Sequence, residues 1–158
     1  AMSKSLKRVK SALFASDPPL EVIETDQATT AKAAAVSLGC AVDQIAKSIL
    51  FEGELSRQLY LFVTAGARQV NLEHAALLAG EPLGKTDAAR IRAVTGFAIG
   101  GVSPVGHLTG ICTFFDETLL NYQKIYAAAG TPIHVFGCAP QQMADLCQGR
   151  ISAFSRQM

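Results

Sequence analysis

The sequence lacks most of the short motifs that identify an enzyme's chemistry directly. It contains no Gly-Lys-Ser/Thr phosphate loop, no Gly-x-Gly-x-x-Gly dinucleotide fingerprint, no His-Glu-x-x-His zinc helix and no Gly-x-Ser-x-Gly nucleophile turn. It has no acidic run that would bind calcium, and its three histidines lie too far apart in the chain to suggest a zinc site. The common nucleotidases, dehydrogenases, zinc proteases and serine hydrolases are therefore not indicated.

An excess of charge of one sign is absent too. The 14 Lys and Arg residues are balanced by 13 Asp and Glu residues, so the net charge of +1 gives no overall positive field that would indicate a nucleic-acid-binding protein. No apolar run approaches the roughly 20 residues that cross a bilayer, and the N-terminal segment has no signal-peptide core. We expect a cytoplasmic protein with no membrane or DNA partner, in which any RNA contact depends on local clusters of basic residues.

Cysteine spacing typical of a metal site is missing as well. The four cysteines, Cys40, Cys112, Cys138 and Cys147, form no Cys-x-x-Cys pair. We interpret them as buried or incidental thiols in a reducing compartment. A cysteine nucleophile would need a histidine partner, and the sequence singles out none, although it does not exclude one.

What is present is a chain of suitable length and composition for one folded domain. Its 158 residues are 49% hydrophobic and 17% charged, which fits a compact core without metal or disulfide support. We predict a single domain over residues 1–158. Both directly paired strands and strands separated by helices are indicated, which predicts an α+β (mixed α/β) fold with a mixed sheet.

Capping residues, turns and hydrophobic periodicity predict the individual elements. The first helix carries Leu6, Val9 and Leu13 at helical spacing and ends before Asp17-Pro18-Pro19. Asn71 and Thr86 are the expected N-caps of the third and fourth helices. The further predicted helices are 29–39, 72–80, 87–96, 116–130 and 140–149, and the predicted strands are 20–24, a hairpin over 46–66, 97–101, 111–115 and 133–138.

One cation and one loop stand out as candidates for chemistry. Lys47 precedes an apolar strand, where it either extends from the strand end into solvent or pairs with a phosphate or an oxyanion at the rim of a pocket. The segment 100–104, Gly-Gly-Val-Ser-Pro, either makes a tight turn or lets its backbone approach a ligand closely. Lys47, this loop and His134 all fall at predicted strand ends.

Three segments, 46–51, 100–107 and 126–136, together resemble the YbaK/ProX family. Its members are freestanding relatives of the editing domain of bacterial prolyl-tRNA synthetase. The resemblance runs in order from about Leu6 to the last predicted helix. Its most specific pieces are the lysine before an apolar strand and the Gly-x-x-x-Pro loop.

The resemblance implies a fold, an activity and a site. The fold is a mixed, barrel-like sheet flanked by helices, and the activity is hydrolysis of mischarged aminoacyl-tRNA without a metal or organic cofactor. The main functional side chain is Lys47, while the loop shapes the aminoacyl pocket and offers backbone groups to the ester, with Gly101 as the catalytic position. The expected substrate-binding residues are Ser48, Gly100, Val102, Ser103, Pro104 and His134.

The expected substrate is tRNA for proline that carries 2-aminobutyrate, alanine or cysteine, and prolyl-tRNA synthetase is the candidate protein partner. Ser48 stands where family branches carry Thr or Asn, so it is expected to tune the choice of amino acid. The roles of His107 and His134 stay open, because His134 either binds substrate or faces solvent.

The basic first helix suggests where tRNA would bind. Lys7 and Arg8 are expected to contact acceptor-stem phosphates, the alternative being an ordinary solvated helix face. Two rival functions remain: a non-catalytic binding module for an aminoacyl end or a small ligand, and a small-ester or thioester hydrolase unrelated to tRNA.

Overall fold

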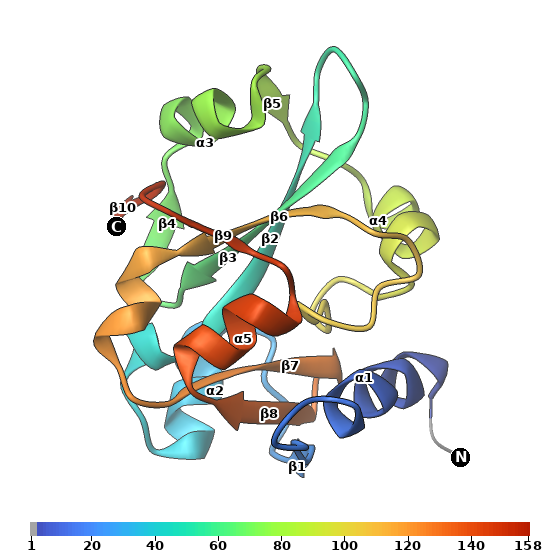
Figure 1. Cartoon of the computed structure of the whole chain (residues 1–158), viewed down its shortest axis with the longest axis vertical. Coiled ribbons are helices and arrows are strands. Elements are labelled where there is room, and N and C mark those ends of the chain that lie inside the picture. The colour runs from blue at the N-terminus through green and yellow to red at the C-terminus, as the bar shows by residue number, and fades with distance from the viewer. Residues whose placement is uncertain (1–2) are drawn as a thin grey trace.

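A computed structural model describes residues 3–158 as helices packed around three β-sheets (Figure 1). The helices are α1 (Lys4–Phe14), α2 (Ala31–Leu38), α3 (Leu72–Ala79), α4 (Ala88–Thr95) and α5 (Pro140–Leu146), with 3-10 turns η1 (Val42–Gln44) and η2 (Glu117–Asn121). The strands are β1 (Ile23–Glu24), β2 (Ala46–Gly53), β3 (Leu59–Ala65), β4 (Arg68–Val70), β5 (Leu83–Gly84), β6 (Cys112–Asp116), β7 (Ile125–Thr131), β8 (His134–Cys138), β9 (Arg150–Ser152) and β10 (Ser155–Gln157).

The largest sheet is mixed, as the sequence predicts. Its strand order is β5-β2-β3-β6-β9, with β2 antiparallel to β3 and with β6 parallel to both β3 and β9. A second sheet has the order β1-β8-β7, and β10 pairs with β4 in a third. The two larger sheets meet at one isolated bridge between Ile45 and Tyr126. The mixed α+β class is confirmed.

Most helix ends lie where their capping residues predict. Thr30 Oγ1 accepts the Ala33 N–H at 3.1 Å at the start of α2, and Asn71 caps α3 in the same way. The predicted cap of α4 is wrong by one residue. Asp87 Oδ1 accepts the Arg90 N–H at 2.7 Å, whereas the Thr86 hydroxyl donates to Glu52 at 3.4 Å.

The predicted helix over 116–130 is wrong beyond its first turn. Asp116 caps only the short turn η2, by accepting the Thr118 N–H at 3.0 Å, and the chain then extends as β7. In β7 the residues Ile125, Ala127 and Ala129 are buried in strict alternation with half-buried neighbours, which is the period of a strand. Alanine favours a helix, but small side chains are needed here because α1 packs directly on β7.

Gly130 shows how close that packing is. A Cβ at Gly130 would lie 3.0 Å from the Ser5 carbonyl oxygen, and its φ of +98° is one that other residues rarely adopt. Leu6, Val9 and Leu13 of α1, predicted as its apolar face, are buried in the main core. The first helix is thus anchored on β7, a strand that lines the candidate active site described below.

The predicted strand over 97–101 is a loop. Phe97 is fully buried as its anchor, and the chain then turns so that the Gly101 N–H donates to the Ala98 carbonyl at 3.1 Å. An apolar run can mark a buried loop anchor as well as a strand, and periodicity over five residues does not separate the two. The short strands β4, β9 and β10 were not predicted, because their pairing depends on partners far away in the chain. Within residues 3–158, no helix combines the length and apolarity that crossing a membrane requires.

Candidate active site

A cavity of about 750 Å³ lies between β2 and β7. These strands belong to different sheets. Ile45, the residue before β2, forms an isolated bridge with Tyr126 of β7, and beyond it both strands line the cavity. The start of α2 and the loop after α4 complete the wall. Small and apolar side chains dominate it, among them Ala46, Val102 and Ala127. Such an enclosure is suited to a small apolar group held beside a few polar atoms.

Two lysines line this cavity: Lys32 of α2, which is exposed, and Lys47, which is half-buried. Lys47 lies in the part of β2 that pairs with β3. Its Nζ donates a hydrogen bond of 3.1 Å to the Gly66 carbonyl. Burial lowers the pKa of Lys47 from its ordinary value, while the carboxylates of Asp43 and Asp116 oppose that change. The side chain therefore extends into the cavity rather than out into solvent.

The support of Lys47 was not predicted from the sequence. Asp43 Oδ1 accepts the Ala67 N–H at 2.8 Å and so fixes the turn that presents the Gly66 carbonyl. Asp116 is fully buried at the end of β6, where Oδ2 accepts the Ala65 N–H at 3.1 Å. No motif signals either carboxylate. Asp43 lies four residues before Lys47, but its hydrogen bond to Ala67 depends on the pairing of β2 with β3, and Asp116 is brought close by the pairing of β3 with β6.

Ser48 follows Lys47 on the same cavity wall. Its Oγ is buried and has no hydrogen-bond partner among residues 3–158. A buried hydroxyl without a partner costs free energy, so this atom is available to a ligand in the cavity. Ser48, predicted as a substrate-binding residue, thus lies on the cavity wall, and its role stays a prediction.

The glycine–proline loop contributes two of its five predicted residues to the wall. Gly100 and Val102 line the cavity, whereas Gly101, Ser103 and Pro104 are buried behind it. The Gly101 N–H is committed to Ala98, and a Cβ at Gly101 would lie 3.1 Å from the Gly130 carbonyl oxygen. The geometry therefore gives Gly101 a packing role. An ester-binding role would require its amide to face the cavity, and the amide does not.

His134 lies on the wall and His107 behind it. His134 Nδ1 is 2.6 Å from Thr131 Oγ1, and both residues line the cavity. His107 Nε2 is 2.6 Å from the Ser103 carbonyl oxygen, and its ring packs edge-on against Phe97. Burial lowers the pKa of His107, which favours the neutral imidazole inside the loop. His134 is thus placed to meet a ligand and His107 to hold the loop.

The two predicted tRNA contacts differ in their environment. Lys7 is exposed on α1, with no fixed partner among the described residues. Arg8 donates to the Gly106 carbonyl at 2.9 Å and to the Gly96 carbonyl at 2.8 Å, with its guanidinium over the Phe97 ring. Arg8 therefore clamps both ends of the loop that carries Gly100 and Val102, a use that leaves it little freedom to bind phosphate.

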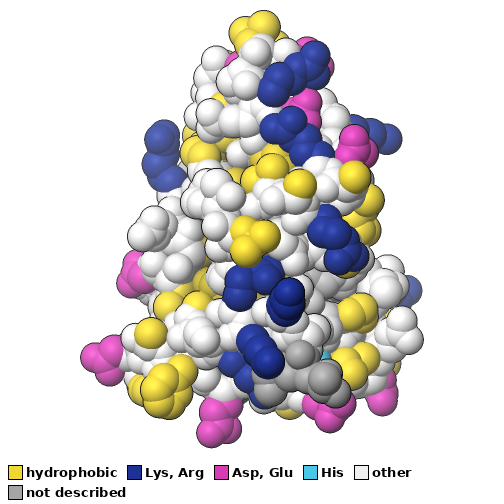
Figure 2. Space-filling view, turned by 90° about the vertical axis from the view of Figure 1, so that its right-hand side faces the viewer, with side chains coloured by type: hydrophobic (Ala, Val, Ile, Leu, Met, Phe, Trp, Pro, Cys, Tyr) yellow, Lys and Arg dark blue, Asp and Glu magenta, His cyan; other side chains and the backbone are white. Residues whose placement is uncertain are grey.

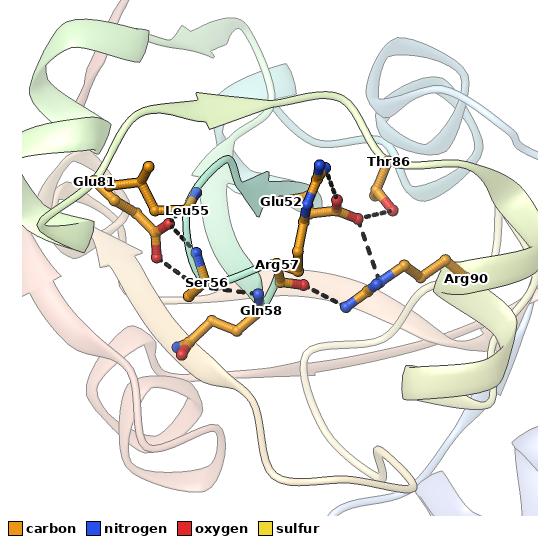
Figure 3. Close-up of polar contacts among 8 residues, drawn as sticks. All are labelled: Glu52, Leu55, Ser56, Arg57, Gln58, Glu81, Thr86 and Arg90. Atoms are coloured by element: carbon orange, nitrogen blue, oxygen red, sulfur yellow. Dashed lines mark hydrogen bonds and ion pairs between the residues drawn. The ribbon is translucent and has the colours of Figure 1, made fainter.

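One ion pair and one hydrogen bond of Arg90 fix helix α4 on another side of the cavity (Figure 3). Arg90 of α4 lies 3.3 Å from Glu52 of β2 and also donates to the Arg57 carbonyl, while Arg57 itself lies 3.2 Å from Glu52. These contacts tie α4 to the hairpin formed by β2 and β3. Ile91, the next residue of α4, lines the cavity, so the network positions part of its apolar wall.

The surroundings of the cysteines do not favour a thiolate nucleophile, because burial raises the pKa of each of the four thiols. Burial raises the pKa values of Cys138 and Cys147 to about 11, which keeps both as neutral thiols near pH 7. None of the four cysteines lines the cavity. Within residues 3–158, no group of three His, Cys, Asp or Glu side chains is arranged to hold a metal ion.

Comparison with known proteins places the chain in a family. The family model of the aminoacyl-tRNA editing domain matches residues 25–146. A crystal structure of a protein described as a proposed trans-editing enzyme for prolyl-tRNA synthetase is 38% identical, with a TM-score of 0.90 over 99% of each chain. The hypothetical protein APE2540, at 23% identity and a TM-score of 0.86 over 94% of this chain and 99% of its own, shares the fold.

A curated relative shows a weaker likeness over most of the chain. The uncharacterized protein YwhH of Bacillus subtilis (strain 168) is 27% identical over 128 residues, which is 81% of this chain and 80% of that protein. The family match covers the segments around Lys47, Gly100 and His134 on which the sequence resemblance rested. The chain therefore belongs to the aminoacyl-tRNA editing domain family.

Proposed function

We propose that this protein removes a small, wrongly attached amino acid from tRNA by hydrolysing the aminoacyl ester, and that it acts separately from the synthetase. The tRNA is that for proline, and the amino acid is 2-aminobutyrate, alanine or cysteine. The family match and the 38% identical structure described as a proposed trans-editing enzyme for prolyl-tRNA synthetase support the substrate class. Prolyl-tRNA synthetase is the candidate partner that would deliver mischarged tRNA.

The observation that carries the proposal is the position of the half-buried Lys47 ammonium at a cavity whose wall is mainly apolar and rich in small residues. Single methylenes change binding in such a pocket by only about 1–3 kcal/mol, so a synthetase needs a second site that admits the smaller amino acid. Ala46, Ala127 and Val102 leave room for a short side chain, and the walls behind them are fixed by packing. The cavity thus has the character of a size-selective site.

The chemistry needs little from the protein. Water attacks the ester carbonyl carbon, the carbonyl oxygen takes up the negative charge, and the bond to the ribose oxygen then breaks. The ribose oxygen leaves with a proton, so the products are the free amino acid and uncharged tRNA. An ammonium held beside the carbonyl oxygen stabilises the negative charge in the transition state, and the cavity orients the ester for attack. Lys47 is the residue placed for that role.

The direct experiment is a deacylation assay with a panel of mischarged tRNAs. We expect the wild-type protein to hydrolyse tRNA(Pro) charged with a small non-cognate amino acid faster than tRNA(Pro) charged with proline. Binding of these tRNAs without turnover would instead support a non-catalytic binding module. Hydrolysis of simple esters or thioesters in preference to aminoacyl-tRNA would support the other rival.

A further inference from the structure

A second cavity, of about 580 Å³, adjoins the active-site cavity. It opens between α1 and the turn that joins β7 to β8, and it is lined by residues that include Lys10, Gln27 and Ile133. The two cavities share Thr131, Pro132 and His134. One short wall therefore faces the aminoacyl site on one side and the second cavity on the other.

The second cavity has the chemical character of an anion site. Among the described residues that line it, Lys10 is the only lysine or arginine and none is Asp or Glu. Glu24 pairs with His134 in the β1–β8 ladder but does not line the cavity. Leu6, Pro132 and Ile133 add apolar surface beside the cation. In the lower part of Figure 2, where α1 lies, Lys and Arg side chains gather in the middle of the view and Asp and Glu side chains lie towards its edges.

His134 presents a defined hydrogen-bonding group at the shared wall. Thr131 Oγ1 already accepts the Ile133 N–H at 3.2 Å, so its own proton is available to His134 Nδ1 at 2.6 Å. A neutral imidazole that accepts at Nδ1 carries its proton on Nε2. Among residues 3–158 no hydrogen-bond partner of Nε2 is present. In this tautomer His134 presents an Nε2–H donor beside both cavities.

We propose that the second cavity binds the ribose and the 5′-phosphate of the nucleotide that carries the aminoacyl ester, with Lys10 at the phosphate and His134 Nε2 at a ribose hydroxyl. This inference rests on the proposed function. The ester bond joins the amino acid directly to the ribose, so the ribose must occupy space next to the aminoacyl cavity. The second cavity adjoins it across the wall that contains His134 and supplies a cation for the adjoining phosphate.

The same placement revises the tRNA contacts expected on α1. Arg8 is committed to the Gly96 and Gly106 carbonyls, whereas Lys10 is exposed at the second cavity. Lys7 lies three residues before Lys10 and so falls on the same side of the helix. Lys10 then meets the first phosphate, and Lys7 is available to the next one along the acceptor strand.

The test uses the dinucleotide cytidylyl-(3′→5′)-adenosine, which has the terminal ribose and its 5′-phosphate but no amino acid. Binding is followed by NMR chemical shifts of the full-length protein, with adenosine as the phosphate-free probe. We expect the dinucleotide to shift the amides of Lys10, Gln27, Ile133 and His134. Lys10→Ala should weaken dinucleotide binding about tenfold and leave adenosine binding unchanged, because only the phosphate contact is lost.

Lys85→Ala is the matched control, since it removes one exposed lysine that lines neither cavity. It should bind the dinucleotide like the wild-type protein, and Lys10→Arg should restore most of the affinity lost in Lys10→Ala. Equal affinity of the wild-type protein and Lys10→Ala, shifts confined to other surfaces, or no binding at all would overturn the proposed nucleotide site. These outcomes are separate from the fate of the proposed function, which depends on whether the wild-type protein hydrolyses aminoacyl-tRNA.

Discussion

Lys47 Nζ lies 3.1 Å from the carbonyl oxygen of Gly66, on the turn that follows the strand paired with its own. Asp43 holds the next amide of that turn, the Ala67 N–H, at 2.8 Å. The position of the ammonium thus depends on a hydrogen bond that the lysine does not itself make. Asp43 also acts through its charge, because its carboxylate raises the pKa of Lys47 against the effect of burial.

Asp43→Asn separates these two effects. The amide oxygen keeps the hydrogen bond to Ala67, but the negative charge is lost, so the pKa of Lys47 falls further below its ordinary value. As the pH is raised, Lys47 of the variant therefore loses its proton at a lower pH than Lys47 of the wild-type protein does. We expect the alkaline limb of the deacylation pH profile to move to lower pH while the rate near pH 6 stays close to that of the wild-type protein.

Asp43→Ala removes the charge and the hydrogen bond together. We expect its rate to fall across the whole pH range, because the turn that presents Gly66 is no longer fixed. Single-turnover deacylation between pH 5 and pH 10 measures both variants. An alkaline limb in Asp43→Asn that coincides with the wild-type limb would show that the Asp43 charge does not act on the catalytic group.

Arg8 is predicted to stabilise the loop rather than bind tRNA. Arg8→Ala removes two hydrogen bonds to loop carbonyls and the contact with Phe97, so unfolding should cost about 2 kcal/mol less and KM should rise as the loop wall shifts. The salt dependence of tRNA affinity should not change. Lys7→Ala should instead keep the stability and reduce that salt slope by roughly 0.7–0.9. A changed salt slope in Arg8→Ala together with an unchanged slope in Lys7→Ala would instead indicate that Arg8 contacts tRNA.

Gly101→Ala tests the role of the loop glycine. The new Cβ would lie 3.1 Å from the Gly130 carbonyl oxygen and from Thr131 Cα, so the loop and β7 must move apart. We expect a loss of about 1–3 kcal/mol of stability together with a parallel loss of activity. Gly110→Ala is the control, because nothing lies within 4 Å of its new Cβ. A large loss of activity at unchanged melting temperature would instead indicate that the Gly101 backbone touches the ester.

Glu81 gives the fold an acid-sensitive contact away from the cavity. Its carboxylate accepts hydrogen bonds from Ser56, from Tyr60 and from the Leu55 amide at the tip of the β2–β3 hairpin, and these lower its pKa from 4.5 to about 2 (Figure 3 shows Ser56 and Leu55). A lowered folded-state pKa adds stability above the unfolded value and loses it as the pH falls. The wild-type melting temperature should therefore exceed that of Glu81→Gln at pH 7, and the difference should shrink between pH 4.5 and pH 2. A constant difference over that range would contradict the account.

Local signals in the sequence were sufficient for much of the fold. Thr30 and Asn71 mark true helix starts, and Leu6, Val9 and Leu13 mark the buried face of α1. The alanines of β7 were wrongly predicted as helical. Small side chains are needed there because α1 packs closely on the strand, and the helix preference of alanine does not decide the structure.

The residues of the candidate site also fall into those that the sequence indicated and those that it did not. Lys47 and His134 were chosen at recognisable strand ends and Ser48 from the family resemblance, and all three line the cavity, while their roles stay predictions. Asp43 could not be predicted, since its contact with Ala67 depends on the pairing of β2 with β3, and the contact of Thr131 with His134 depends on the turn between β7 and β8. Lys10 was noted in the basic first helix, but only the packing of α1 beside that turn puts it at the second cavity. Gly101 was chosen from the glycine pair, whose conformation alone does not reveal which of the two faces the cavity.

The most direct test of the central claim is single-turnover deacylation of mischarged tRNA(Pro) by Lys47→Ala. The side chain is half-buried and makes one hydrogen bond, so the variant should fold with a melting temperature close to that of the wild-type protein. Loss of a preorganised charged donor should lower the rate on the order of a hundredfold. Near-normal turnover by the folded variant would contradict the claim that the Lys47 ammonium stabilises the transition state.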